Sequence, residues 1–114
     1  MRIEKFEDIN AWQRARTLTF SIYKILGSNK DYGFKDQIQR ASVSVMNNIA
    51  EGFERRGDKE FKHFLSIAKG SCGEVRSMLY LGCELKYITK QEFEELYTLT
   101  IETSKMIAGF MKVL

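Results

Sequence analysis

The stretch QIQRASVSVMNNIAEG, residues 37–52, carries two stripes of side chains at helical spacing. Apolar residues recur every three or four positions, as the core-facing side of an amphipathic helix requires; they are Ile38, Ala41, Val45, Ile49 and Phe53. A second stripe, about 100° around the helix axis, consists of Gln37, Arg40, Ser44, Asn48 and Glu51. Because this stripe is rich in short and amide side chains instead of Lys and Glu, we expect it to pack against a neighbour.

The same periodicity continues on both sides of this stretch and predicts four helices. They are expected near residues 10–26, 33–56, 58–87 and 90–113. Breaks at Gly27, Gly57 and Thr89 separate them, and the 114-residue chain contains no proline. Four long helices with short connections predict an all-α fold, an antiparallel up-down-up-down four-helix bundle in which residues 1–114 form a single domain.

Polar residues near the breaks are placed to cap three of these helices. Asp8 or Asn10 can cap the first helix, and Asp58 can cap the third. Thr89 and Glu92 have the spacing of a capping box at the start of the last helix. The expected core faces are Trp12, Ala15, Leu18, Ile22, Tyr23 and Leu26 in the first helix, Phe61, Leu65, Ala68, Cys72, Val75 and Leu79 in the third, and Phe93, Leu96, Tyr97, Thr100, Ile107, Phe110 and Leu114 in the last.

Several motifs, taken in order, resemble one known family. They are Trp12-Gln13-Arg14-Ala15, Gln37 through Ser42, Asn48-Ile49-Ala50-Glu51-Gly52, Phe61 through Ser71 with Glu74, and Leu85-Lys86-Tyr87-Ile88. With these motifs the chain resembles the small four-helix-bundle proteins encoded in intervening sequences of bacterial 23S ribosomal RNA genes. The resemblance implies an all-α bundle, assembly as a ring-like homopentamer and no established enzymatic activity. It also implies kinship with the accessory protein of diversity-generating retroelements, a basic pentamer that works with a reverse transcriptase and RNA.

Small residues lie opposite the core face of the third predicted helix. They are Ser66, Gly70, Gly73 and Ser77, with His63 beside them. A glycine inside a helix costs about 1 kcal/mol relative to alanine, and two such glycines on a solvated face would bring no gain. Because small residues let another backbone approach closely, this face is predicted to be an oligomer interface. The alternative is neutral drift on an exposed face.

Basic residues form a third face of the same helix. Lys62, Lys69 and Arg76 are seven residues apart, and a seven-residue step drifts only about 20° around the axis. Arg55, Arg56 and Lys59 extend this stripe toward the preceding turn, and the six residues are the predicted nucleic-acid-binding site. The alternative is an ordinary solvated face, because Glu54, Asp58 and Glu60 are interleaved and Asp58 can pair with Lys62.

The net charge of +3 is unevenly distributed. Residues 1–90 carry 16 Lys and Arg against 11 Asp and Glu, whereas residues 91–114 carry 2 against 4. The positive field therefore belongs to the first three helices. No apolar run approaches the roughly 20 residues needed to cross a membrane, and no signal-peptide pattern opens the chain. We expect a cytoplasmic protein without a membrane partner.

The chain has few residues suited to catalysis or metal binding. We expect no catalytic residues, metal, cofactor or small-molecule substrate, because no nucleophile–base set and no phosphate loop is present. Glu60 and His63 match one of the two Glu-x-x-His elements that a di-iron site needs, but His63 is the only histidine, so we attribute the match to chance. Glu51 and Glu74 can meet across the second and third helices, where hydrogen bonding is a simpler role than acid–base chemistry. Cys72 and Cys83 lie about 16 Å apart along one helix, beyond disulfide reach.

Three classes of function remain open. The leading hypothesis is a non-enzymatic homo-oligomer that binds structured RNA or a ribonucleoprotein through its basic lateral surface. The second is a structural ring, or adaptor, whose partner is another protein. The third is a catalytic bundle. Metal analysis and the geometry of the carboxylate side chains test this class.

Overall fold

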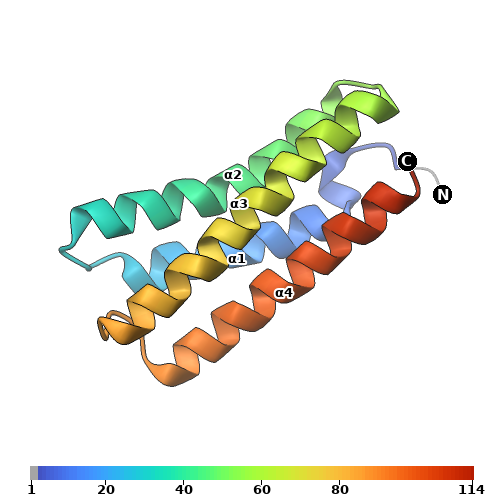
Figure 1. The fold of residues 1–114 in the computed structure, drawn as a ribbon. Coiled ribbons are helices and arrows are strands. Elements are labelled where there is room, and N and C mark those ends of the chain that lie inside the picture. The colour runs from blue at the N-terminus through green and yellow to red at the C-terminus, as the bar shows by residue number, and fades with distance from the viewer. Residues whose placement is uncertain (1–2) are drawn as a thin grey trace.

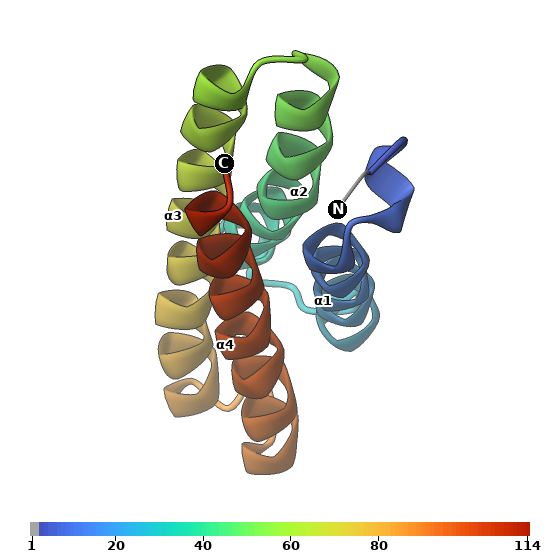
Figure 2. The same ribbon diagram turned by 90° about the vertical axis from the view of Figure 1, so that its right-hand side faces the viewer.

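The computed structural model describes residues 3–114. Within this range the chain forms four α-helices and no strand, after one turn of 3-10 helix, as Figure 1 shows. The elements are η1 (Phe6–Asp8), α1 (Asn10–Leu26), α2 (Tyr32–Glu54), α3 (Asp58–Glu84) and α4 (Lys90–Lys112). Figures 1 and 2 show the helices side by side in alternating directions, and α1 contacts both α2 and α4. The prediction of an all-helical fold with four helices is confirmed for the described residues.

One hydrophobic core fills the space between the four helices. The predicted core face of α3 is fully buried, and so are Ile38, Val45 and Ile49 of α2. Phe53, Phe93, Tyr97 and Phe110 are only half-buried at the edges of this core. Tyr23 was expected in the core, but it lies at its margin with 46% of its surface exposed.

The caps at the starts of the helices follow the sequence prediction only for α4. The predicted caps Asp8, Asn10 and Asp58 do not cap, because the N-cap positions are Ile9 and Gly57, which make no side-chain cap hydrogen bond. The capping box of Thr89 and Glu92 is confirmed, with both hydrogen bonds formed.

Two non-glycine residues with left-handed backbone shorten the predicted second and third helices. Arg56 has φ 66° and Lys86 has φ 63°, and these residues follow the ends of α2 and α3. After Lys86, the Tyr87 N–H donates to the Gly82 carbonyl, which closes the last turn of α3. Glycine is the usual residue where a helix ends in a left-handed conformation, but these two positions hold Arg56 and Lys86. The sequence pattern therefore predicted both helices to end two or three residues too late.

Helices α2 and α3 approach each other closely at Gly52. A Cβ atom placed there would sit 2.6 Å from the Phe64 Cβ and 3.0 Å from the Phe61 Cδ1. Gly52 is therefore required by the contact between α2 and α3, and it fixes how the two helices are aligned along their axes. Further along the same pair, the Ser44 and Ser71 hydroxyls are 2.8 Å apart.

At the end of the bundle opposite the α2–α3 connection, a hydrogen bond joins the α1–α2 connection to the α3–α4 connection. The Tyr87 hydroxyl donates to Asp31 Oδ2 over 2.6 Å, and the Phe34 N–H donates to Asp31 Oδ1 over 3.1 Å. The Tyr87 bond, followed by the Phe34 bond, lowers the pKa of Asp31 below its ordinary value of 3.8. The same contact raises the pKa of Tyr87 above its ordinary value of 10.0.

We expect Tyr87→Phe to raise the pKa of Asp31 toward 3.8, because the largest cause of its lowering is removed. The contribution of Asp31 to stability is present above its unfolded pKa and is lost as the pH falls through the folded pKa. The contribution of Tyr87 is present below its unfolded pKa and is lost as the pH rises through its folded pKa. Wild type and variant should therefore differ in stability at pH values between the folded pKa of Asp31 and the folded pKa of Tyr87. At lower and at higher pH their stabilities should converge.

A carboxyl NMR titration of Asp31, with chemical unfolding at several pH values, measures both effects. Tyr23→Phe is the control, since Tyr23 is an exposed tyrosine outside this contact. An Asp31 pKa that is identical in wild type and Tyr87→Phe would contradict the assignment.

Candidate nucleic-acid interface

The basic stripe lies on the flank of α3 that faces α4. Tyr80 follows Arg76 by one helical turn and packs against Phe93 and Tyr97 of α4, at ring distances of 5.2 and 6.1 Å. Lys62 and Lys69 are exposed, and Arg76 is half-buried. The three residues therefore follow the groove between two helices along one side of the bundle.

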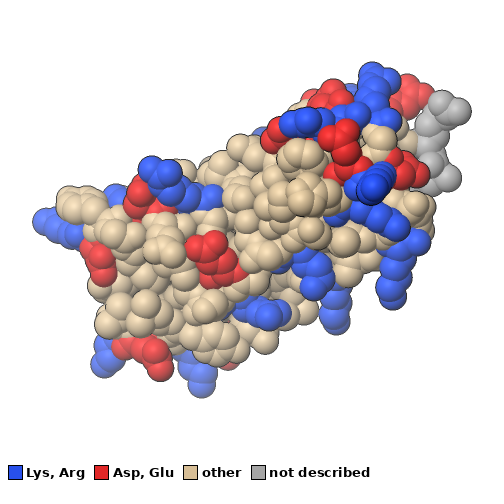
Figure 3. All heavy atoms as spheres, turned by 45° about the horizontal axis from the view of Figure 1, so that its top comes forward, with Lys and Arg blue, Asp and Glu red and all other residues tan. Residues whose placement is uncertain are grey.

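Three of the six predicted nucleic-acid-binding residues lie around the connection between α2 and α3. Arg55 forms ion pairs with Glu51 (3.0 Å) and Glu60 (3.7 Å) and lies 5.0 Å over the Phe64 ring. All three residues are exposed, but only Arg55 is engaged by carboxylates of its own chain. Figure 3 shows Lys, Arg, Asp and Glu side chains gathered together at this end.

The remaining positive charges are not neutralised by neighbouring carboxylates. Among the described residues, Arg56, Lys59, Lys62, Lys69 and Arg76 form no ion pair within 4.0 Å. The Asp58–Lys62 pair that the sequence allows does not form at this distance. Five of the six predicted residues are therefore available to an external anion.

The small-residue face of α3 points away from the core. Ser66, Gly70 and Ser77 are exposed, and Gly73 is half-buried. A Cβ atom on Gly70 or Gly73 would meet nothing within 4 Å. The internal packing of this chain therefore does not require either glycine, in contrast to Gly52.

The polar stripe of α2 forms hydrogen bonds with α3. The Asn48 amide donates to the Ser44 hydroxyl (2.9 Å), which lies against Ser71, and the Gln37 amide donates to Glu74 (3.2 Å). Gln37 and Ser44 of this stripe therefore contact α3, whereas Arg40 and Glu51 are exposed and pair with Asp36 and Arg55 one turn away. Figure 3 shows a broad area without charged side chains across the middle of the face on which α2 and α3 lie.

The proposed meeting of Glu51 and Glu74 is wrong. Glu51 pairs with Arg55, next to Gly52, and Gly52 lies against Phe61 and Phe64. Glu74 instead lies beside Gln37, much nearer the start of α2. The antiparallel alignment of α2 and α3 therefore places the two carboxylates at different levels of the bundle.

The residues that can bind metals are dispersed. No group of three His, Cys, Asp or Glu side chains suited to a metal ion occurs among residues 3–114. His63 is exposed and lies edge-on to Phe64, with ring centres 5.8 Å apart. Burial raises the pKa of the Cys72 thiol to about 11, although the charges of Arg76 and Lys69 oppose the rise. Within the described chain no helix has the length and hydropathy of a membrane span.

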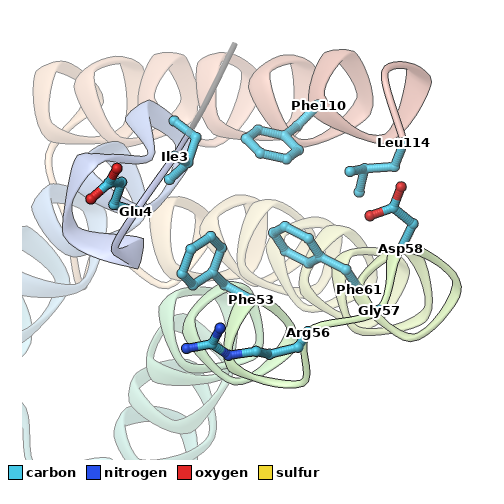
Figure 4. A pocket seen from close by; sticks show the side chains of 9 residues that line it. All are labelled: Ile3, Glu4, Phe53, Arg56, Gly57, Asp58, Phe61, Phe110 and Leu114. Atoms are coloured by element: carbon cyan, nitrogen blue, oxygen red, sulfur yellow. The ribbon is translucent and has the colours of Figure 1, made fainter.

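A hollow at the end of the bundle was not predicted from the sequence. It has a volume of about 650 Å³ and lies where the α2–α3 connection meets the end of α4. Figure 4 shows Phe53, Phe61 and Phe110 lining it, with Arg56 and Asp58 near the connection. Its lining comes from three separate stretches of the chain, from Ile3 to Leu114, so helical periodicity gave no signal for it. Its polar groups include no nucleophile with an adjacent base.

Comparison with known proteins gives one family and one fold. The family described as "23S rRNA-intervening sequence protein" matches residues 7–109. Among solved structures, a similar chain is a protein of unknown function from the S23 ribosomal protein family of Bacteroides thetaiotaomicron. It superposes with a TM-score of 0.83 at 24% sequence identity, over 90% of this chain and 98% of that chain. This likeness shows a shared fold. A comparison with curated proteins finds no match.

Proposed function

The chain belongs to the 23S rRNA-intervening sequence protein family, and from this premise we propose that it is a non-enzymatic, homo-oligomeric RNA-binding protein of the cytoplasm. It binds structured RNA, or a ribonucleoprotein, through the basic flank of α3. It needs no cofactor and no metal, and it takes no small-molecule substrate.

The observation that carries the proposal is the row of cations on α3. Lys62, Lys69 and Arg76 are spaced about 10 Å apart along the helix, and none forms an ion pair within residues 3–114. Lys and Arg that neutralise phosphates release condensed counterions, and this release supplies affinity without sequence preference. Repetition of the row around an oligomer would raise its combined affinity.

We expect the protein to bind a fluorescent RNA hairpin with an affinity that falls steeply between about 50 and 200 mM salt. Each phosphate contact contributes about 0.9 to the slope of log affinity against log salt, so three contacts per protomer give a slope near 3. Fluorescence anisotropy at several salt concentrations measures this slope. Failure to bind any structured RNA at the lowest salt concentration would contradict the proposal.

The second part of the proposal is assembly as the homopentamer that the family resemblance implies, with a seam along Ser66, Gly70, Gly73 and Ser77. We expect Gly70→Leu with Gly73→Leu to lower the particle mass measured by light scattering. Leucine would keep another copy's backbone at a distance, while a Cβ atom at either position meets nothing of this chain within 4 Å. Far-UV circular dichroism should show unchanged helix content. An unchanged particle mass would place the seam elsewhere.

One observation favours the second candidate, a structural ring that binds another protein. Ile67, Leu81 and Leu85 on the outer side of α3 are 39 to 47% exposed. Exposed apolar side chains beside an uncharged face suit a protein partner better than a phosphate backbone. The hairpin experiment separates the two candidates, since a protein adaptor shows no salt-dependent RNA affinity.

A further inference from the structure

The outer side of α1 combines exposed aromatic rings with positive charge. Phe20 is 68% exposed and Tyr23 is 46% exposed. Trp12, Arg16 and Phe20 are spaced four residues apart, so they share one side of the helix. The Arg16 guanidinium lies 5.8 Å over the Trp12 ring. This surface, called here the α1 face, was not predicted from the sequence.

The charge of residues 9–30 is one-sided, although Glu7 of η1 lies beside the α1 face. Residues 9–30 contain four Lys and Arg and no Asp or Glu, whereas α2, α3 and α4 each contain several acidic residues. Arg14 is turned toward α4, where it pairs with Glu102 at 3.5 Å. Arg16, Lys24 and Lys30 form no ion pair within the part of the chain that the structure describes. Their charge therefore points outward.

A hollow of about 510 Å³ lies on this face between Trp12, Gln13, Arg16, Thr17 and Phe20. Glu7 also lines it and is its only carboxylate. Figure 2 shows that, apart from η1, no other element covers the side of α1 turned away from the bundle. The hollow is thus an open recess between aromatic rings, with one guanidinium at its wall.

The aromatic and basic character continues to the start of α2. The Lys35 Nζ donates to the Gly27 carbonyl at the end of α1 (3.2 Å) and lies 5.1 Å from the centre of the Tyr32 ring. This contact holds Tyr32, which is 66% exposed, beside the same end of α1. Exposed rings therefore extend from Phe20 to Tyr32, whereas Trp12, at the other end of the α1 face, is half-buried.

We infer that the α1 face binds unpaired nucleotides of RNA by stacking bases on its exposed aromatic rings. Proteins that hold single strands combine a positive groove with aromatic side chains on which successive bases stack. About 12 Å separates Trp12 from Phe20 along the helix, which leaves space for a short run of bases. The inference rests on the proposed function, because it gives the RNA ligand a second contact, diagonally opposite the basic flank of α3.

A second copy of this chain is a poorer occupant. Two α1 faces brought together would place Arg16, Lys24 and Lys30 of each copy against like charges, which opposes association. An apolar protein partner would leave these cations without counter-charges. An unpaired RNA segment supplies both π-faces and phosphates, so it matches both properties of the surface.

The test uses Trp12, which is the only tryptophan of the chain. An oligouridine of about 12 nucleotides, within the range of known single-strand sites, is titrated into the full-length protein. We expect it to quench Trp12 fluorescence, while a blunt RNA duplex binds without quenching. Phe20→Ala should weaken oligouridine binding about tenfold, as loss of one stacked base does.

Two further variants separate the surfaces. The first is a triple variant, Lys62→Glu with Lys69→Glu and Arg76→Glu. It should weaken duplex binding and leave the quenching of Trp12 at saturating oligouridine unchanged. Lys105→Gln removes an exposed charge from α4 and should change neither readout. Duplex binding without any quenching by oligouridine would overturn the inference and leave the proposed function standing.

The remaining outcomes are equally definite. Quenching by oligouridine with no duplex binding would support the inference and overturn the proposed role of the α3 flank. Absence of binding by either RNA would overturn both. A lower particle mass in Phe20→Ala would show that the α1 face binds a second copy, which also overturns the inference.

Discussion

Replacing Gly52 with leucine is expected to lower the free energy of unfolding by about 3 kcal/mol, the upper part of the usual range for overpacking. The reason is steric, since even a Cβ atom at this position lies 2.6 Å from the Phe64 Cβ. Relief would require α2 and α3 to separate along their longest contact. Since domains of this size are stable by only about 5 to 15 kcal/mol, the loss is a large part of the total. Urea unfolding followed by circular dichroism measures it.

Gly109→Ala is the matched control for this substitution. Gly109 also lies inside a helix, but a Cβ atom there meets nothing within 4 Å. Alanine has the higher helix propensity, so this variant should be more stable than wild type by up to about 1 kcal/mol. If leucine at position 52 were tolerated as well as alanine at position 109, the helices would not meet at Gly52 as described.

Reversing three charges on α3 should have the largest effect on binding. With Lys62, Lys69 and Arg76 all replaced by glutamate, we expect affinity for an RNA hairpin to fall beyond detection. Each reversal removes a phosphate contact and adds repulsion, and the salt dependence should flatten with it. Helix content should survive, because none of the three side chains belongs to the core. Anisotropy against salt concentration, for wild type and variant, gives both quantities.

Particle mass must be measured beside affinity in this experiment. A variant that loses assembly as well as binding would show that the cations contact a neighbouring subunit. Equal affinity in wild type and variant would show that RNA binds elsewhere. Lys105→Gln serves again as the control for a charge lost from another helix.

The helices were predictable because each one repeats its apolar residues over about four or more turns. The buried residues Ile38, Val45, Leu65 and Leu79 follow directly from that repeat. The end of α3 was not predictable in the same way, because Lys86 takes a left-handed conformation that is more typical of glycine. There, the tertiary contact between Tyr87 and Asp31 outweighs local preference.

The candidate sites were only partly predictable, since a helical pattern defines faces but not how two helices are aligned along their axes. By helical periodicity, Glu51 and Glu74 lie on the sides of α2 and α3 that face each other. The contacts of Gly52 with α3 and of Glu74 with Gln37 show that the two carboxylates lie at different levels of the bundle. Arg55 fits the basic stripe by position, but two carboxylates and the Phe64 ring hold it. The α1 face was not predictable from Phe20, because a single aromatic residue on the polar side of a helix indicates a binding surface only when its exposure is known.

The cyclic order of helix contacts has a consequence for how the chain folds. Each α-helix packs on its neighbour in sequence, and among the four α-helices of residues 3–114 only α1 and α4 pair across distant segments. Hairpins of consecutive helices close short loops, so their entropic cost is small and the topology favours rapid folding. The α1–α4 pairing closes the largest loop and is the step with the highest entropic cost. Docking of the first helix against the last should therefore come late in the folding reaction.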